Sequence, residues 1–410
     1  MLNSMKNSLI LTLLLLAASV TLCAQASSKN IITHIRVLAN DSLEGRGTGT
    51  AGEKLAMAYI QSQWKEMKLI PKGDGKSYSQ KFSFKSGTHG TGKEGTSYNL
   101  VGYIDNRAVN TIIIGAHYDH LGMGMESGSL DANPQNKIHN GADDNASGVA
   151  GVLELARYFQ TNKIKEAYNF LFLCFSGEEL GLYGSKYFTE NPTIDLSKAN
   201  FMINLDMVGR LNPDSKNLTV SGSGTSALFE PLLKSLSNDK VQIKTDSSGM
   251  GPSDHTSFYL KNIPVLHFFT GSHSDYHKPT DDWDKINAEG EKEVLNVIIR
   301  LVEKLEKQPK LSFLPTKNKS MSSSRSFKVT MGVMPSYSSS EEGLKVDGVS
   351  EGKPAQKAGI QTGDLIMQIG DFKIKDIQAY MDALSKFEKG QTVPVKLKRG
   401  NEMVVVNVTF

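Results

Sequence analysis

Short apolar runs recur along the first three quarters of the chain. Four of them contain few polar residues, and they occupy residues 111–116, 169–175, 201–205 and 263–269. Runs of this length and uniformity are typical of strands that are buried on both faces, as in parallel sheets covered by helices. We therefore expect these four segments to lie side by side in a mainly parallel sheet.

Helical periodicity separates these runs. Residues 146–160 place Val149, Val152 and Ala156 on one helix face, and residues 53–67 show the same spacing. Helices that alternate with buried strands predict an α/β fold, with a mainly parallel mixed sheet sandwiched by helices.

The pattern stops at residues 308–326, where prolines, scattered lysines and a serine run indicate a linker. Residues 327–410 then regain short strand-like runs, with one helical pattern at residues 377–387. We therefore predict two domains, at residues 27–307 and 327–410.

Residues 1–26 have the pattern of a secretory signal peptide. Lys6 precedes an apolar run at residues 9–20, and small residues follow. No later stretch approaches the roughly 18 apolar residues of a membrane span. We expect an exported protein, periplasmic or secreted, without a transmembrane span. A lipid anchor at Cys23 is the less favoured alternative, because the bulky Leu22 precedes it.

Charge and cysteine content narrow the function classes. The 410 residues carry a net charge of +3, which gives no reason to expect a nucleic-acid partner or an anionic membrane. Cleavage after Ala26 leaves only Cys174, which lies inside an apolar run and is expected to be a buried, inert thiol. Cysteine catalysis and an internal disulfide framework are therefore not expected.

Imidazole and carboxylate side chains follow the predicted strands. In chain order they are His117, Asp119, His120, Asp143, Asp144, Glu178, Glu179, Asp206 and His277. Carboxyl ends of parallel strands meet at one sheet edge, where open α/β sheets form ligand sites. A mixed His/Asp/Glu set without thiolates suits zinc or a similar divalent ion in a catalytic site. This pattern predicts metal-assisted hydrolysis.

Several of these residues stand in stretches that resemble the M28 metallopeptidases. The stretches are His117-Tyr118-Asp119, Gly141 to Gly148, Ser176 to Gly181, Asn204 to Met207 and Tyr276 to Pro279. The resemblance extends over roughly residues 30 to 305 and includes Gly45 to Gly49. It implies a zinc exopeptidase-like fold and two zinc ions, or similar divalent metals, per chain.

Carried over by position, the family pattern implies five metal ligands. His117 and Asp206 would bind one zinc, Glu179 and His277 the other, and Asp144 would bridge them. His120 and Asp143 are expected to be solvated or to support neighbouring ligands.

The family pattern also implies roles beside the metals. Glu178 would be the general base, since adjacent residues at a strand end point to opposite sides. Asp119 would orient a ligating imidazole, and Tyr276 stands where some relatives stabilise the oxyanion. The bond between Asp144 and Asn145 would be a cis peptide. The segment Ser253-Asp254-His255 resembles one near the substrate cleft, without an assigned chemistry.

The C-terminal segment resembles a PDZ domain of the type attached to exported bacterial proteases. The resemblance rests on Thr330 to Val333, Gly343 to Val349, Pro354 to Ile360 and Gly363 to Ile366. PDZ domains bind an extended peptide and hold its terminal carboxylate in backbone amides. Thr330, Met331, Gly332 and Val333 would form that carboxylate loop. The alternative is a module that packs on the catalytic domain without binding a peptide.

Together these features predict an exported di-zinc exopeptidase acting on peptides or proteins, with aminopeptidase activity the favoured reaction. The ligand set does not separate an aminopeptidase from a carboxypeptidase. A glutaminyl cyclase on the same fold is disfavoured by the intact second ligand set, and a non-catalytic PDZ peptide-binding protein is disfavoured by the complete site.

Overall fold

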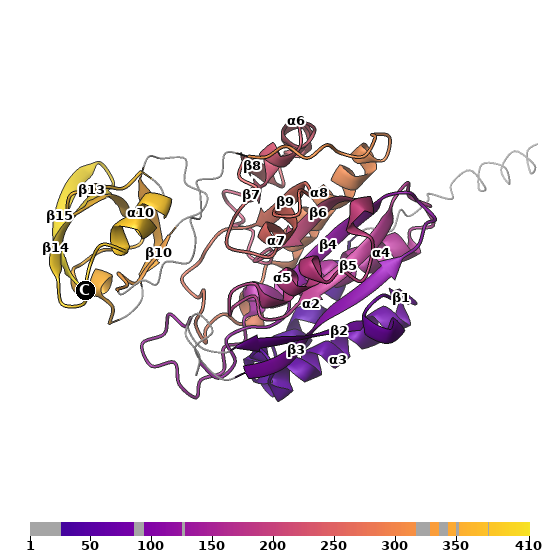
Figure 1. The fold of residues 1–410 in the computed structure, drawn as a ribbon, viewed down its shortest axis with the longest axis horizontal. Coiled ribbons are helices and arrows are strands. Elements are labelled where there is room, and N and C mark those ends of the chain that lie inside the picture. The colour runs from indigo at the N-terminus through magenta and orange to yellow at the C-terminus, as the bar shows by residue number, and fades with distance from the viewer. Residues whose placement is uncertain are drawn as a thin grey trace, which may run out of the picture.

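The computed structural model describes residues 26–85, 94–124, 128–316, 329–335, 343–349, 352–375 and 377–410. Within these ranges the chain forms two units, each built on its own sheet (Figure 1). The predicted signal peptide, apart from Ala26, and Cys23 lie outside the described residues, as do residues 317–326 of the predicted linker.

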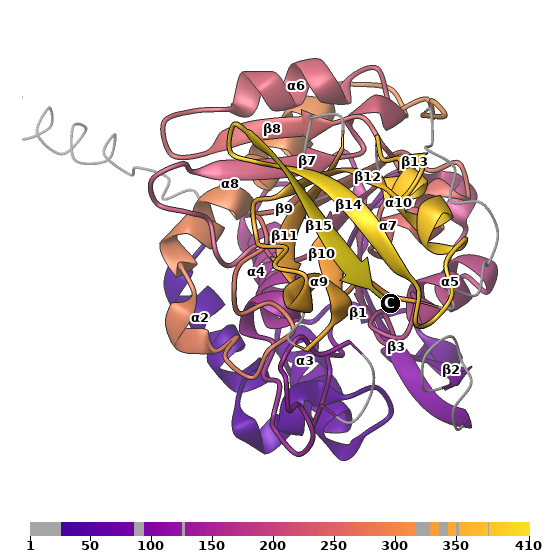
Figure 2. The same ribbon diagram turned by 90° about the vertical axis from the view of Figure 1, so that its left-hand side faces the viewer.

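The larger sheet has nine strands in the order β1-β3-β5-β4-β6-β9-β7-β8, with β2 beside β3. They are β1 (Ile70–Pro71), β2 (Ser79–Lys85), β3 (Glu94–Ile104), β4 (Thr111–His117), β5 (Asn169–Phe175), β6 (Ala199–Leu205), β7 (Asn217–Ser221), β8 (Gln242–Asp246) and β9 (Val265–Phe269). The four central strands β5, β4, β6 and β9 run parallel, whereas β3 and β7 pair antiparallel with them. Figure 2 shows β2 and β3 at one end of this sheet and β7 and β8 at the other. The expected mainly parallel mixed sheet is confirmed.

Each of the four apolar runs forms a central strand. Every residue of β4, β5 and β6 is buried, because helices cover both faces of the sheet. In β4, Ile112 and Ile114 join the core on one face, while Ile113 joins the core on the other. Burial on both faces is why these strands contain uninterrupted apolar residues instead of alternating ones.

Seven α-helices accompany this sheet in the described part of the chain. They are α2 (Ser28–Leu38), α3 (Ala51–Glu66), α4 (Gly148–Thr161), α5 (Tyr183–Glu190), α6 (Phe229–Leu236), α7 (His255–Tyr259) and α8 (Ala288–Leu305). Helices α2, α4 and α8 share the core of Ile112, whereas α5 and α7 pack Phe188 and Phe258 into the core of Ile113. Short helical turns are η1 (Asp41–Arg46), η2 (Asp74–Lys76), η4 (Ala142–Ser147), η5 (Leu196–Lys198), η6 (Ser223–Thr225) and η7 (Trp283–Lys285).

The predicted helix at residues 146–160 begins later than expected. The backbone of Asp144 and Asn145 is not helical, and α4 follows only from Gly148. The peptide bond between Asp144 and Asn145 is cis, as the family resemblance implies. This irregular turn places Asp144 at the edge of the sheet instead of inside a helix.

The C-terminal unit has a six-stranded sheet in the order β10-β11-β12-β14-β15, with β13 beside β12. Its elements are β10 (Val333–Pro335), β11 (Leu344–Val349), α9 (Pro354–Lys357), β12 (Leu365–Ile369), β13 (Phe372–Lys373), α10 (Ile377–Leu384), β14 (Thr392–Arg399) and β15 (Glu402–Thr409). Ile366, Val395, Leu397 and Val408 are fully buried in a core of its own. No helix in the described residues has the length and apolar character needed to cross a membrane.

A buried histidine in the main domain is expected to make the fold sensitive to acid. His34 lies 2.7 Å from the Tyr59 hydroxyl through Nδ1, and burial lowers the pKa of His34 to about 4. This pKa lies below the value of about 6.5 for histidine in the unfolded chain. The contribution of neutral His34 to stability is therefore complete above about pH 6.5 and is lost as the pH falls towards 4. We expect His34→Gln to remove about 2–3 kcal/mol of the stability difference between pH 7 and pH 4.5.

Urea unfolding of metal-stripped protein at these two pH values measures the effect. Tyr59→Phe is the matched control, since it keeps the buried imidazole and should keep the wild-type pH dependence. Equal pH dependence in wild type and His34→Gln would contradict the prediction.

Candidate metal centre

The predicted ligands come together at the carboxyl ends of the central strands. His117 ends β4, and Glu179 and Asp206 follow β5 and β6. His277 stands in the loop after β9, and Asp144 lies in η4. Strand order alone therefore brings segments from five parts of the sequence to one edge of the sheet, as expected for this class of fold.

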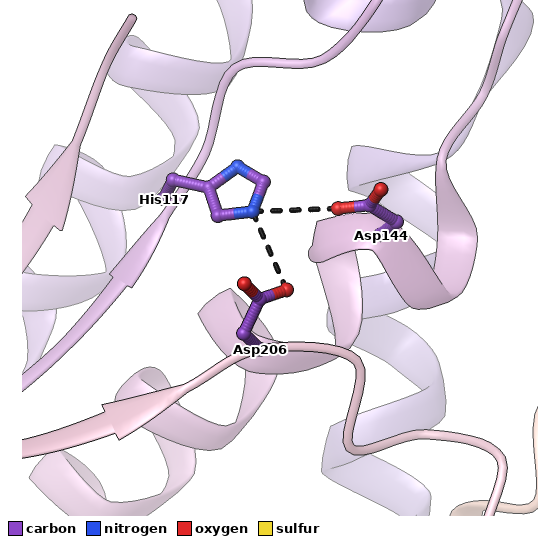
Figure 3. A group of neighbouring side chains, drawn as sticks. All are labelled: His117, Asp144 and Asp206. Carbon is purple, nitrogen blue, oxygen red and sulfur yellow. Dashed lines mark ion pairs between the residues drawn. The ribbon is translucent and has the colours of Figure 1, made fainter. Parts of the chain in front are cut away.

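His117, Asp144 and Asp206 form the first group. His117 Nε2 lies 3.3 Å from Asp144 Oδ1 and 3.5 Å from Asp206 Oδ1 (Figure 3). Their ligand atoms lie within 4.8 Å of one another, a spacing that one metal ion can span. This is the grouping expected for the first zinc.

The second group lies on the other oxygen of Asp144. His277 Nε2 lies 3.0 Å from Asp144 Oδ2 and 3.2 Å from Glu179 Oε2. Asp144 therefore presents Oδ1 to His117 and Oδ2 to His277. This is the geometry required of a carboxylate shared by two ions.

His120 also belongs to this second group, which the sequence did not predict as a coordinating position. Its Nδ1 lies 2.7 Å from Glu179 Oε1 and 4.0 Å from Asp144 Oδ2. Ligand atoms of His120, Asp144 and Glu179 lie within 4.8 Å of one another. Glu179 thus has an imidazole beside each oxygen, from His120 and from His277. The signal was available in the sequence, since His120 comes directly after Asp119, just beyond the end of β4.

The charges in the site favour a bound cation. Burial alone would lower the pKa of His117, but Glu178, Asp206 and Asp144 raise it well above 6.5. Burial is likewise outweighed at His277, where Glu179 and Asp144 raise the pKa well above its ordinary value.

The carboxylates show the complementary shifts. Burial would raise the pKa of Asp144, but His117 and His277 hold it well below its ordinary value. In the same way His277 outweighs burial and lowers the pKa of Glu179 to about 2. These carboxylates are stabilised in their charged form by positive neighbours. Zinc binds imidazole nitrogens and carboxylate oxygens and would displace the protons that these carboxylates hold on the two imidazoles, so the residues present fit a divalent ion.

Asp119 is fully buried between three segments. Its Oδ2 accepts a hydrogen bond from the Thr48 hydroxyl at 2.8 Å, and its Oδ1 accepts one from the backbone N–H of Glu178 at 3.2 Å. His117 Nδ1 lies closer to the backbone oxygen of Asp119, at 3.2 Å, than to its carboxylate, at 3.8 Å. Asp119 can therefore orient His117 mainly through its carbonyl, while its carboxylate fixes the chain at Glu178.

Glu178 lies among negative neighbours. Burial raises its pKa, and although His117 opposes this, Glu179, Asp254 and Asp206 raise it further, to well above 4.5. A carboxylate with a raised pKa is a stronger proton acceptor, which suits a general base working near neutral pH.

Tyr276 is half-buried beside the second group. Its ring stacks on His277 with ring centroids 3.9 Å apart. Burial, with Asp144 and Glu179 nearby, raises the pKa of Tyr276 well above 10. The phenol therefore remains an O–H donor at neutral pH.

A cluster of buried polar groups lies near the first metal group. It belongs to the segment Ser253-Asp254-His255, to which the sequence analysis assigned no chemistry. Both carboxylate oxygens of Asp254 and both ring nitrogens of His255 are buried without a hydrogen-bond partner. The His255 ring stacks on His267, with centroids 4.6 Å apart. Asp254 interacts electrostatically with His117 and Asp206, so this cluster belongs to the surroundings of the metal groups.

Sequence reasoning missed Arg46, which is 1% exposed. Its guanidinium donates hydrogen bonds to four backbone oxygens, those of Leu38, Tyr118, Asn140 and Gly141. Burial lowers the pKa of Arg46 to about 10, while Asp144 and Asp119 counteract part of the shift. Arg46 thus places a positive charge near the acidic site. Its hydrogen bonds also link two segments of that site, the one after β4 at Tyr118 and the one before Asp144 at Asn140 and Gly141.

The predicted carboxylate loop of the C-terminal unit lies immediately before and at the start of β10. Gly332 has φ of 76°, a backbone conformation that favours glycine, and its N–H donates to the Thr330 hydroxyl at 3.2 Å. The Met331 side chain is fully buried in the core, and its carbonyl accepts from the Ala355 N–H at 2.8 Å. Met331 therefore has a packing role, and its peptide-binding role stays a prediction.

Two known enzymes are similar to this chain in sequence. Leucine aminopeptidase 2 of Trichophyton equinum is 28% identical over 194 residues, which cover 44% of this chain and 38% of the relative. Leupeptin-inactivating enzyme 1 of Streptomyces exfoliatus is 27% identical over 259 residues, which cover 62% of this chain and 50% of the relative. The chain thus aligns with half or less of the length of these relatives.

Solved structures share the fold. A Zn-dependent exopeptidase from Parabacteroides distasonis has a TM-score of 0.56 at 18% identity and covers 68% of this chain and 99% of its own. Glutaminyl cyclase from Porphyromonas gingivalis has a TM-score of 0.55 at 20% identity, with coverage of 68% and 99%. The sequence profile of peptidase family M28 matches residues 99–302, and that of the PDZ domain matches residues 329–410. The chain therefore carries a domain of peptidase family M28 followed by a PDZ domain, as its motifs predicted.

Proposed function

We propose that this protein is a di-zinc exopeptidase that releases N-terminal residues from peptides. The observation that carries the proposal is the pair of His and carboxylate groups that share Asp144. The M28 match and the leucine aminopeptidase relatives support a metallopeptidase with this preference.

The residues fit two metal ions. His117 and Asp206 would hold one ion, His277 and Glu179 the other, and Asp144 both. Zinc bound there would supply Lewis-acid chemistry, polarising the scissile carbonyl and lowering the pKa of the attacking water.

The protein's own groups would move the proton. Glu178, with its raised pKa, would take a proton from the attacking water and return it to the leaving amine. Tyr276, which remains protonated, would donate a hydrogen bond to the negative oxygen that develops on the carbonyl. Asp119 would hold His117 and the backbone of Glu178 in place during these steps.

The second candidate is a glutaminyl cyclase, since solved cyclases share this fold. The complete second group, with Glu179 between His120 and His277, supports hydrolysis instead. A carboxypeptidase would use the same ligands and differs only in which peptide end it recognises.

Two further proposals concern the rest of the chain. The N-terminal pattern of residues 1–26 supports export to the periplasm or the medium. The PDZ domain supports binding of a C-terminal peptide at Thr330, Met331, Gly332 and Val333.

The test combines zinc stoichiometry with a substrate panel. Purified protein is first analysed for zinc. It is then given four versions of one peptide: with both ends free, with an acetylated N-terminus, with an amidated C-terminus, and with glutamine as the N-terminal residue. Near two zinc ions per chain, with cleavage only of peptides with a free N-terminus, supports the proposal. Loss of cleavage on amidation would favour a carboxypeptidase, and loss of ammonia from the glutamine peptide without cleavage would favour a cyclase. If the protein binds the peptides but none of them reacts, the result would favour a non-catalytic protein that binds peptides through its PDZ domain.

A further inference from the structure

We infer that Asp281 is a positioning residue that fixes the bridging carboxylate of Asp144 relative to His277. The inference rests on the proposed function, because it concerns the same metal groups. Asp281 is fully buried, and its Oδ2 accepts hydrogen bonds from the backbone N–H groups of Asp143, at 3.0 Å, and Asp144, at 3.1 Å. Its own carbonyl accepts from the Ala142 N–H at 3.1 Å.

These three N–H groups need an acceptor from outside the turn. They precede α4, and the backbone at Asp144 is not helical, with φ of −107° and ψ of 93°. Leaving a buried N–H group without an acceptor is unfavourable. Asp281 supplies the acceptors for three successive residues, so the backbone that carries Asp144 is set by one side chain and one carbonyl.

The same residue is tied to His277. The N–H of Asp281 donates to the Lys278 carbonyl at 3.1 Å, closing a turn that begins immediately after His277. A movement of Asp281 would therefore displace a ligand candidate on each side, Asp144 through its N–H and His277 through this turn.

Charged and polar side chains lie beside the hydrogen bonds that link Asp281 to the segments of Asp144 and His277. His273 Nε2 lies 3.2 Å from Asp143 Oδ2, and Arg210 Nη1 lies 2.9 Å from Asp275 Oδ2. Arg210 Nη1 is also 3.9 Å from Asp281 Oδ1. A cation and an imidazole thus stand beside the buried carboxylates, which reduces the cost of burying their charge.

Asp281→Leu tests the inference. Leucine keeps the branched shape of the side chain but has no acceptor atom, so it removes both hydrogen bonds to Oδ2. Loss of a residue that orients ligands typically costs 10–100-fold in metal affinity. We expect zinc affinity, measured by competition with a chromogenic chelator, to fall about 10–100-fold, with kcat reduced and KM little changed at saturating zinc.

Asp282→Leu is the matched control. The side chain of the neighbouring Asp282 accepts from the Trp283 N–H, at 2.8 Å, where it caps η7. It should keep the zinc affinity of the wild type. Unfolding in urea with chelator present separates stability from binding, because a purely structural role for Asp281 would lower stability and leave the zinc affinity of the folded protein unchanged.

The outcomes are separable. Wild-type protein that binds no zinc would defeat the proposed function itself, whereas equal zinc affinity in wild type and folded Asp281→Leu would overturn only this inference. If Asp281→Leu does not fold, Arg210→Gln decides, since it removes the contacts of Arg210 to Asp275 and to the edge of Asp281. A fall in zinc affinity of several-fold in that variant supports the inference, and unchanged affinity overturns it.

Discussion

Replacing Glu178 by glutamine is expected to lower turnover about 10²–10⁴-fold while the zinc content stays at the wild-type level. Glutamine has the shape of glutamate but cannot take a proton from water. The expected ligands lie elsewhere, at Asp144 and its partners, and the hydrogen bond from the Glu178 N–H to Asp119 is unaffected by the change. The raised pKa of Glu178 makes the lost group a strong base among carboxylates, which is why the effect should be large.

Initial rates with a peptide bearing an N-terminal leucine, together with elemental analysis for zinc, measure both quantities. Glu303→Gln, on an exposed position of α8, serves as a control and should behave as wild type. Unchanged turnover in Glu178→Gln would remove Glu178 as the base. A joint loss of zinc and turnover would make it a ligand instead.

The parts of the fold that could be predicted are those whose signal is local. The run at residues 169–175 became β5 with the predicted bounds, because burial on both faces demands continuous apolar residues. Strand β3 was not predicted, although it lies beside β5, because buried polar residues such as Ser97 and Asn99 interrupt its apolar pattern. Helix α8 was missed for a different reason, since its amphipathic pattern is present in the sequence but was not singled out.

The candidate site shows the same division. Positions such as His117 and Asp206 could be predicted because each directly follows an apolar run. The parallel arrangement of the strands then places both at the same edge of the sheet. Arg46 and Asp281 act through backbone groups distant in the sequence, such as the carbonyl of Asn140 and the N–H of Asp144. Such contacts leave no spacing rule in the sequence, so the supporting residues appear only once the segments are brought together.

Arg46 is the supporting residue whose loss should affect stability most. Its Nε donates to the Tyr118 carbonyl at 2.9 Å, between His117 and Asp119, and its Nη2 donates to the Gly141 carbonyl at 3.0 Å. The guanidinium therefore joins the end of β4 to the turn that carries Asp144. It also places a buried positive charge near several carboxylates and so reduces their mutual repulsion.

We expect Arg46→Met to lower the free energy of unfolding of the metal-free protein by about 3–5 kcal/mol, because it removes the buried charge and a donor to four backbone carbonyls, of which that of Gly141 keeps a hydrogen bond from the Ala146 N–H. Urea unfolding with chelator present measures this loss. Arg36→Met is the matched control, because Arg36 is exposed and its guanidinium lies over the Trp283 ring, 4.1 Å from the ring centroid. It should cost about 0.5–1 kcal/mol. Zinc should restore part of the stability of Arg46→Met, since a divalent cation replaces some of the missing positive charge. A loss no larger than that of Arg36→Met would show that water or neighbouring groups can satisfy these carbonyls, and that the acidic site is stable without Arg46.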